Sequence, residues 1–260
     1  MRIVKLTPKP RKNPNLPVEA ESIIPEHFMD NNAGSFGDLT VWEGNKERKF
    51  CDFFDIEISG EAASPDDIEL VLAGETRTIK RIGEYMAAGK ITVEGDIGMH
   101  CGNFMSGGVI EIMGNADGWL GREMRGGRIL CHGNAGHYCG SGYRGEKRGM
   151  RGGVLEVMGD AGDFCAEFLA GGEIIIHGSC GDMTGVDMRD GVLKVYGECR
   201  RACGNMKGGT AYFYGKVNAM HPTFRDEGET DVDGKIMHHF TGDVANRGKG
   251  SLYVKEYEYY

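Results

Sequence analysis

A glycine-marked repeat in residues 86–217 limits the fold of this chain more than any other feature. Each copy reads Met-x-Gly-Gly, then a short apolar run, then another glycine, most clearly at 105–114, 124–133 and 150–159. The anchor glycines are spaced by 19, 19, 26, 19, 19 and 18 residues, so the third copy carries a seven-residue insertion. The anchors are Gly89, Gly108, Gly127, Gly153, Gly172, Gly191 and Gly209.

The columns of the repeat indicate short strands. The second and fourth residues after each anchor are apolar or small, as in Ile110 with Ile112, which is the alternation of a strand with one inward face. A methionine precedes most anchors by three residues, and a glycine follows each by about six. Nineteen residues are too few for a strand–helix–strand unit, which needs about 30. We therefore predict an all-β fold, a right-handed parallel β-helix (β-solenoid) of about seven regular 19-residue coils with irregular N- and C-terminal segments.

The remaining segments are less regular. Residues 1–50 are expected to form an extended Pro-rich arm and lead-in, because residues 1–25 hold five of the seven prolines. Residues 51–85 are expected to form irregular first coils or a cap, residues 86–217 the β-helix repeats, and residues 218–260 a C-terminal cap and tail with a final strand or partner contact. Caps are expected because an open solenoid end exposes strand edges and core.

Charge and hydropathy exclude several classes of protein. The net charge of −9 argues against general nucleic-acid binding, which requires a basic face. No stretch approaches the ~18 apolar residues of a membrane span. The first residues lead into a polar, Pro-rich segment rather than a signal peptide. We therefore expect a cytoplasmic protein with no nucleic-acid partner and no membrane span.

The eight cysteines are interpreted as buried structural thiols. Two columns, eight and twelve residues after the anchors, mix Cys with Ala, Leu, Ile or Thr, as small interior residues do. No CxxC occurs, and Cys199 with Cys203 alone is a weak signal for the alternative, a metal or Fe–S site. A disulfide between Cys180 and Cys199 is sterically feasible on adjacent coils, but a cytosolic compartment disfavours it.

No catalytic, cofactor-binding or metal-binding residue is predicted. The histidines form no HxxxH or HxH pair, and Leu130 separates Glu111 from Glu156 in their shared outward column. Gly140 to Gly145 matches GxGxxG, but a dinucleotide site requires a preceding strand and a following helix. Here the match lies at the edge of a repeat, and a glycine-rich corner explains it.

Two features remain that core packing does not explain. The insertion YRGEKRG is basic, and its Tyr143, Arg144, Lys147 and Arg148 are candidates for a partner or anionic-ligand contact; a solvated loop is the alternative. The outward strand positions are unusually apolar, so we predict that another subunit or the terminal segments cover this sheet. These positions are Val109, Leu130, Met158, Ile175, Tyr196, Tyr212 and Tyr214.

The phrases GGVLEVMGDAGDF and GGRILCHGNAGHYCG carry a resemblance to known families. They resemble the β-helix domain at the C-terminus of the glutamate synthase large subunit. More specifically, residues 86–217, with their Tyr-Arg-Gly insertion, resemble the C subunit of formylmethanofuran dehydrogenases. The C subunit of the bacterial formyltransferase/hydrolase complex is similar in the same repeats.

The resemblance implies a function for the chain within a complex. It implies a non-catalytic scaffold of an archaeal oxidoreductase that reduces CO2 and attaches the formyl group to methanofuran in methanogenesis. A tungsten or molybdenum pterin, Fe–S clusters and a dinuclear metal site would then lie on other subunits. Those partners would be amidohydrolase-like, pterin-binding and ferredoxin-like. The alternatives are the C subunit of the formyltransferase/hydrolase complex of C1 metabolism, or an independent β-helix binding module or hydrolase.

Overall fold

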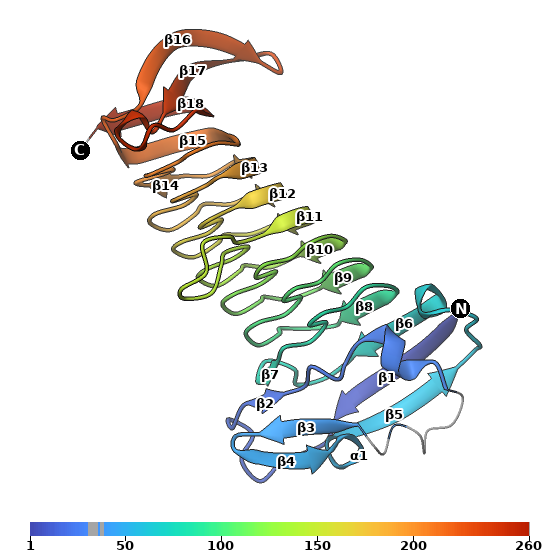
Figure 1. The fold of residues 1–260 in the computed structure, drawn as a ribbon. Coiled ribbons are helices and arrows are strands. Elements are labelled where there is room, and N and C mark those ends of the chain that lie inside the picture. The colour runs from blue at the N-terminus through green and yellow to red at the C-terminus, as the bar shows by residue number, and fades with distance from the viewer. Residues whose placement is uncertain (31–35, 37–38, 260) are drawn as a thin grey trace.

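The chain folds into two β-sheets with a few short helical turns (Figure 1). A computed structural model describes residues 1–30, 36 and 39–259. In these ranges, a fourteen-stranded, mostly parallel sheet runs along the molecule, and a four-stranded sheet lies beside its N-terminal end. None of the helices in these ranges has the length and apolar character needed to cross a membrane. The expected all-β class is confirmed.

Each of the seven sequence repeats contributes one strand, and these strands pair in parallel in chain order. Ile129 pairs with Ile110 on one side and with Leu155 on the other, at separations of 19 and 26 residues. The seven-residue insertion therefore loops out and leaves the register intact. The strands are β8 (Lys90–Val93), β9 (Val109–Ile112), β10 (Arg128–Cys131), β11 (Arg151–Val157), β12 (Ala170–Ile176), β13 (Asp190–Val195) and β15 (Thr210–Met220).

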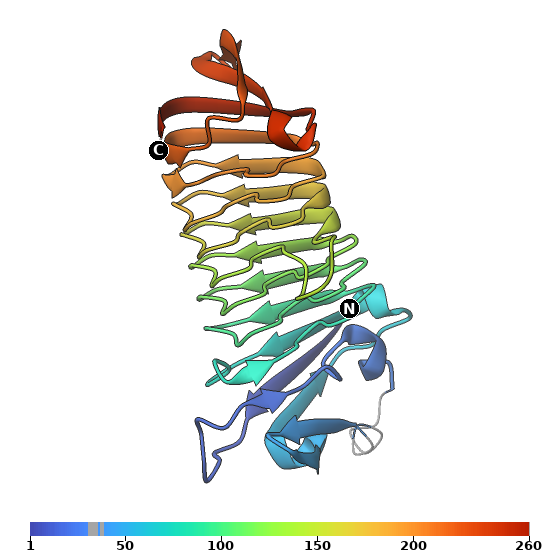
Figure 2. The same cartoon turned by 60° about the vertical axis from the view of Figure 1, so that its left-hand side comes forward.

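The segments between these strands also stack, one repeat on the next (Figures 1 and 2). Isolated parallel bridges join the position eight residues after successive anchors, as between Ala116 and Ala135. Near the end of the stack this row includes β14 (Cys199–Arg200), which pairs with the second half of β15. Each repeat is thus hydrogen-bonded to its neighbours along more than one side.

The predicted inward columns are the core of the molecule. The column of six methionines and Leu169 is fully buried, as are the second and fourth positions after each anchor. The anchor glycines permit this close stacking. At Gly127, φ is +79°, and an added Cβ would lie 2.7 Å from the carbonyl oxygen of Gly108 in the preceding repeat. An L-residue there would meet both a strained backbone and a steric clash.

The N-terminal residues, expected in an extended arm, belong to the large sheet. Strand β1 (Arg2–Pro8) lies between β6 (Ile68–Leu72), to which it is parallel, and β5 (Phe54–Ser59), to which it is antiparallel. Val4 and Leu6 are fully buried, so the inward alternation of the repeats continues through β1. The apolar alternation of β1 is short and is followed by prolines and basic residues. That composition is the reason why the sequence predicted an extended arm here.

The smaller sheet and an aromatic cluster close this end of the stack. The sheet contains β2 (Val18–Glu19), β3 (Thr40–Glu43), β4 (Lys46–Lys49) and β7 (Ile79–Lys80). The aromatic cluster joins four rings: the centroid of Phe28 lies 4.8 Å from that of Phe36 and 5.8 Å from that of Phe50, and Phe50 lies 4.7 Å from Phe54. Short helices flank it: η1 (Pro25–Phe28), α1 (Phe50–Phe53) and η3 (Pro65–Asp67).

A hairpin ends the stack on the C-terminal side. Strand β18 (Gly250–Tyr259) is parallel to β15, so the last residues form the final strand that was expected. Strand β17 (Lys235–Gly242) pairs antiparallel with β18, and β16 (Arg225–Val232) forms the outer edge. The turn η4 (Val244–Asn246) leads into β18. The hairpin of β16 and β17 projects beyond the last repeats (Figure 1).

Candidate functional site

A row of stacked rings runs along one corner of four successive repeats. His100, Trp119, Tyr138 and Phe164 each lie eleven residues after an anchor glycine, and their centroids are 5.1, 4.9 and 5.1 Å apart. All four have left-handed φ values between 58° and 68°. Such a backbone costs of order 1–3 kcal/mol for a non-glycine residue, and each stacked pair returns about 0.5–1.5 kcal/mol. The same left-handed backbone recurs at Met183 in the next repeat and, four residues further on within the repeats, at Phe104 and Glu123, so it is a regular turn geometry of the stack.

The insertion places Tyr143 against this row. Its ring centroid lies 6.0 Å from that of Trp119 and 6.2 Å from that of His100. The guanidinium carbon of Arg122 lies 4.8 Å from the Tyr143 centroid and 4.6 Å from that of Phe104. Arg122 is therefore held by two aromatic rings in cation–π contacts.

Tyr143 helps to enclose a hollow of about 290 Å³, which we call the Tyr143 pocket. Three buried polar atoms of its lining have no hydrogen-bond partner within the described ranges: His100 Nδ1, Asn103 Oδ1 and Arg122 Nε. Asn103 is only 1% exposed. Buried polar groups without partners are rare in proteins and call for an explanation. The pocket is lined by Glu19, Arg81, His100, Asn103, Arg122 and Tyr143.

The charges around the pocket are unevenly neutralised. Arg81 contacts Glu84 through Nε at 2.5 Å and Nη2 at 3.0 Å, and Nη1 lies 3.3 Å from Glu19. The hydrogen bond with Glu84 raises the pKa of Arg81. Burial is the largest of the effects that lower the pKa of His100 to about 4. The positive charges of Arg122, Arg81 and Lys80 also lower it, and Asp117 opposes them with a smaller effect. His100 is therefore uncharged at neutral pH.

Of the four predicted contact residues, the structure brings only Tyr143 into this site. Arg144, Lys147 and Arg148 are exposed, and their side chains make no hydrogen bond or ion pair within the described part of the chain. Arg144 also lines a second hollow of about 170 Å³ beneath the insertion, beside Trp119. The three cations thus remain available to a partner or ligand.

Sequence reasoning missed His100, Asn103 and Arg122. The signal that was available is the column eleven residues after the anchors, where His, Trp, Tyr and Phe recur in consecutive repeats. Nothing in the spacing indicated that Asn103 and Arg122 would be left with unpartnered atoms.

The outward face of the large sheet carries ion pairs among its apolar residues. Glu111 contacts His132 at 3.1 Å and Lys90 at 3.2 Å, and these hydrogen bonds lower its pKa. Glu156 contacts His177 at 2.9 Å and Arg128 at 2.5 Å. Of the seven apolar positions expected here, Val109, Met158 and Tyr196 are exposed and the other four are half-buried. Coverage of this face by another subunit stays a prediction.

The cysteines behave as interior residues. Seven are buried as free thiols, and Cys51 is exposed. Burial raises the pKa of Cys203 to about 12 and that of Cys131 to about 11, so these thiols stay protonated at neutral pH. Among the described residues, no three His, Cys, Asp or Glu side chains converge as a metal would require. Gly145 lies in a turn and is followed by strand β11 rather than by a helix, so the GxGxxG match lacks the setting of a dinucleotide site.

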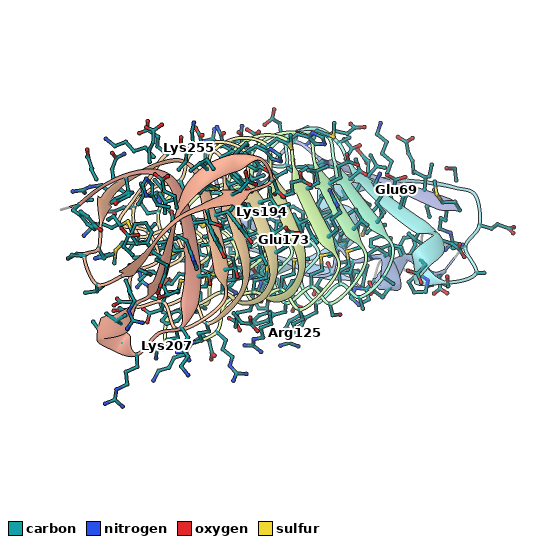
Figure 3. All side chains as sticks on the ribbon, turned by 90° about the horizontal axis from the view of Figure 1, so that it is seen from above. Glu69, Arg125, Glu173, Lys194, Lys207 and Lys255 are labelled. Atoms are coloured by element: carbon teal, nitrogen blue, oxygen red, sulfur yellow. The ribbon has the colours of Figure 1, made fainter. Side chains whose placement is uncertain are left out.

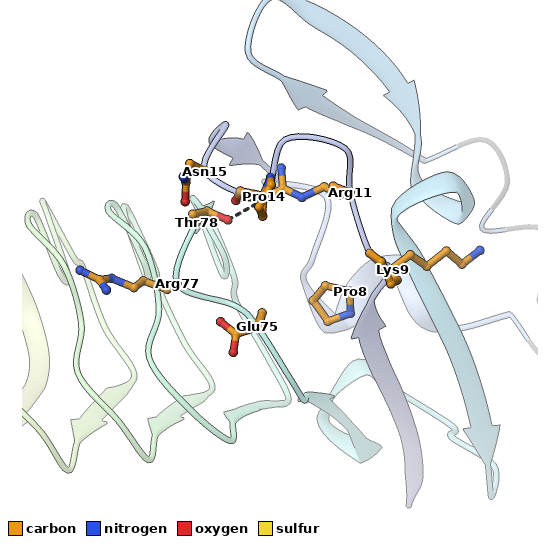
Figure 4. A pocket seen from close by; sticks show the side chains of 9 residues that line it. Pro8, Lys9, Arg11, Pro14, Asn15, Glu75, Arg77 and Thr78 are labelled. Atoms are coloured by element: carbon orange, nitrogen blue, oxygen red, sulfur yellow. Dashed lines mark hydrogen bonds between the residues drawn. The ribbon is translucent and has the colours of Figure 1, made fainter.

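A larger hollow of about 460 Å³ lies where the N-terminal segment crosses the start of the stack (Figure 4). Arg11 Nη2 donates to Thr78 Oγ1 at 2.7 Å, and Lys9 Nζ donates to the carbonyl of Cys51 at 2.7 Å. These cations are engaged in joining segments of the chain. We therefore interpret this hollow as a structural junction.

Viewed from above, Arg125 and Lys207 lie at one edge of the molecule and Lys255 at the opposite edge (Figure 3).

Comparison with known proteins identifies the family. No protein-family model matches the chain. The chain is 50% identical over 256 residues to the C subunit of the tungsten-containing formylmethanofuran dehydrogenase 2 of Methanococcus maripaludis, and the alignment covers 92% of each protein. The chain belongs to the family of formylmethanofuran dehydrogenase C subunits. The resemblance inferred from the repeats is thereby confirmed.

Other members of this family align over shorter segments. The C subunit of the tungsten-containing enzyme of Methanothermobacter wolfeii is 38% identical over 103 residues, which cover 39% of this chain and 37% of the relative. The C subunit of the molybdenum-containing enzyme of Methanosarcina barkeri is 37% identical over 91 residues, which cover 35% and 30%. The chain thus spans about a third of the length of these two relatives.

A solved structure supports the fold at full length. A chain in the crystal structure of the formyltransferase/hydrolase complex from Methylorubrum extorquens, determined in complex with methylofuran, superposes with a TM-score of 0.86 at 25% identity. The superposition covers 96% of this formylmethanofuran dehydrogenase family member and 98% of that chain.

Proposed function

We propose that this chain is a non-catalytic scaffold subunit of a cytoplasmic formylmethanofuran dehydrogenase, an oxidoreductase that reduces CO2 and attaches the formyl group to methanofuran. The observation that carries the proposal is the 50% identity to the Methanococcus maripaludis C subunit over 92% of both proteins. We further propose that the repeats wind as a right-handed parallel β-helix of about seven coils. The continuous register between Ile110, Ile129 and Leu155 supports this.

The metal groups of the complex belong, in this proposal, to other subunits. Two relatives are named as tungsten- and molybdenum-containing. Burial raises the pKa values of Cys131 and Cys203, and both thiols lie in interior columns. Among the described residues no three His, Cys, Asp or Glu side chains converge, which supports placing the pterin metal, the Fe–S clusters and the dinuclear site on other subunits. The proposed partners are amidohydrolase-like, pterin-binding and ferredoxin-like subunits.

Two surfaces are proposed to meet these partners. The first is the insertion with Tyr143, Arg144, Lys147 and Arg148, whose three cations are exposed and without side-chain partners in the described ranges. The second is the outward face of the large sheet, where exposed Met158 and other apolar side chains lie among ion pairs.

A second candidate is the C subunit of a formyltransferase/hydrolase complex. The superposition on a chain of the Methylorubrum extorquens complex, with a TM-score of 0.86, favours this candidate. The sequence identity to that chain is 25%, half of the 50% to the dehydrogenase subunit. The dehydrogenase is therefore the first choice.

Purification from the native organism tests the proposal. A tagged full-length chain should co-elute with larger subunits that contain tungsten or molybdenum and iron by elemental analysis, and the fraction should reduce CO2. Co-elution with subunits that lack these metals would favour the formyltransferase/hydrolase. Elution as a lone chain would overturn both assignments.

A matched pair of triple variants tests the insertion. The variant R144A/K147A/R148A should lower the yield of assembled complex by about tenfold, because it removes three exposed cations at the proposed contact. The control K207A/R247A/K249A removes three exposed cations near the last repeat and should assemble normally. Equal yields from the two variants would remove the insertion from the interface.

A further inference from the structure

We propose that the Tyr143 pocket binds a carboxylate group that is carried next to an amide N–H, as in an acylated amino acid or a peptide terminus. The site is distinct from the exposed cations of the insertion, although Tyr143 belongs to both.

The unpartnered atoms define the chemistry of a matching ligand. Arg122 Nε is a donor and requires an acceptor, whereas Asn103 Oδ1 is an acceptor and requires a donor. A ligand that satisfies both must accept a hydrogen bond at one place and donate at another. Burying either atom without a partner costs about 1–3 kcal/mol, so a ligand that supplies both bonds gains binding free energy. A carboxylate beside an N–H has this combination.

The charge of the lining favours a single negative charge on the ligand. Arg81 is neutralised by Glu84 and lies 3.3 Å from Glu19. Arg122 makes no side-chain hydrogen bond to the described residues, and its Nε lies 4.0 Å from Glu123, at the limit of an ion pair. Glu123 also contacts Arg151 at 3.4 Å, so two guanidinium groups share one carboxylate and a positive charge remains to meet an anion. The planar donors of a guanidinium match a carboxylate in two-point contact. A phosphate dianion would carry an excess negative charge beside Glu19.

The shape of the pocket suits a small group. At about 290 Å³ it is at the lower end of the range for ligand pockets, so it holds the terminal group of a larger molecule. His100 and Tyr143 supply flat walls, and uncharged His100 offers Nδ1 as a further hydrogen-bonding atom. Tyr143 is 45% exposed, so its ring forms a solvent-facing wall of the pocket.

The carboxylate has two potential sources. It is either a free acylated amino acid or an acidic group of a partner subunit, and only the second source rests on the proposed scaffold function. The first test uses the full-length chain by itself and is therefore independent of complex assembly.

The fluorescence of Trp119 provides a direct readout. The chain has two tryptophans, Trp119 and Trp42, and Trp42 belongs to β3. The substitution W42F therefore leaves Trp119 as the single fluorescent reporter. In this background, N-acetylglycine should change the fluorescence saturably, while uncharged N-acetylglycinamide and inorganic phosphate should not. No saturable change with N-acetylglycine, or an equal response to the amide or to phosphate, would overturn the proposal.

Three variants in the same background assign the response to the pocket. R122Q should weaken N-acetylglycine binding at least tenfold, whereas R125Q should bind normally because Arg125 lies outside the pocket lining. E19Q should bind several-fold more tightly, since it removes an acidic group from the lining; a variant that had merely lost its fold would not gain affinity. Unchanged binding in both R122Q and E19Q would place the ligand elsewhere.

Comparison with the assembled complex separates the two sources. If the natural ligand is free, the complex should bind N-acetylglycine as the chain does. If a partner carboxylate occupies the pocket, the complex should not respond while the chain does, and R122Q should lower the yield of complex. Both results support the pocket, and they differ only in the source of the carboxylate.

Discussion

Asn134 Oδ1 accepts a hydrogen bond of 2.8 Å from the backbone N–H of Asp160, one repeat further along the chain and beyond the seven-residue insertion. The same contact recurs at this corner: Asn115 accepts from the N–H of Asn134 at 2.9 Å, and Asp160 accepts from that of Ser179 at 2.7 Å. Polar side chains at this corner thus join each repeat to the next. They satisfy backbone donors that would otherwise face solvent at the corner.

Removal of this acceptor should destabilise the stack measurably. N134A should lower the free energy of unfolding by about 1 kcal/mol, the usual net contribution of one hydrogen bond. N134D is the matched control, because Asp160 shows that a carboxylate can serve at this corner. Urea denaturation of the full-length chain measures both. Equal destabilisation by N134A and N134D would mean that the hydrogen bond contributes nothing.

Neighbouring residues of β10 should differ sharply in their effect on stability. Ile129 is fully buried in the column that pairs with Ile110 and Leu155, so I129A should cost about 2–5 kcal/mol through lost burial and a cavity. Leu130 faces outward, so L130A should cost less than about 1 kcal/mol in the isolated chain. Urea midpoints compare the two. Similar costs would contradict the assignment of inner and outer faces.

The repeats were predictable because their constraints are local and periodic. Spacing alone identified the seven-residue insertion, and the pairing of Ile129 with Leu155 follows from it. The pairing of β1 with β6 was not predictable in this way. It joins Arg2 to Ile68, far apart in sequence, and the alternation of Val4 and Leu6 is too short to be distinguished from a loop.

The candidate site was predictable only in part. The insertion showed that Tyr143 stands outside the repeat pattern, but its direction depends on the packing of its ring beside Arg122 and Trp119. Column patterns describe which face a residue occupies and not which polar atoms stay unpartnered. What marks Asn103 as a candidate is its buried, unpartnered oxygen, which depends on the three-dimensional packing around it.

The environment of His100 predicts a loss of stability in acid. Its folded pKa of about 4 is below the usual value of about 6.5, so the unfolded chain takes up a proton in this interval and the folded chain does not. The free energy of unfolding should therefore fall as pH is lowered from about 6.5 to about 4. H100Q should lose this dependence, so wild type should weaken relative to H100Q across the interval. Parallel pH profiles of the two proteins would contradict the lowered pKa.

The thiols should separate into one reactive residue and seven protected ones. Cys51 is exposed, whereas the other seven thiols are buried out of reach of reagents, and burial raises the pKa of Cys131 to about 11. A disulfide reagent such as 5,5′-dithiobis(2-nitrobenzoate) should therefore label one thiol in the native chain and all eight in denaturant. C51S should abolish the native reaction and leave the urea midpoint unchanged. A second thiol that reacts in the native C51S variant as fast as Cys51 does in wild type would show that the interior columns open to solvent, contrary to the tight stacking around the anchor glycines.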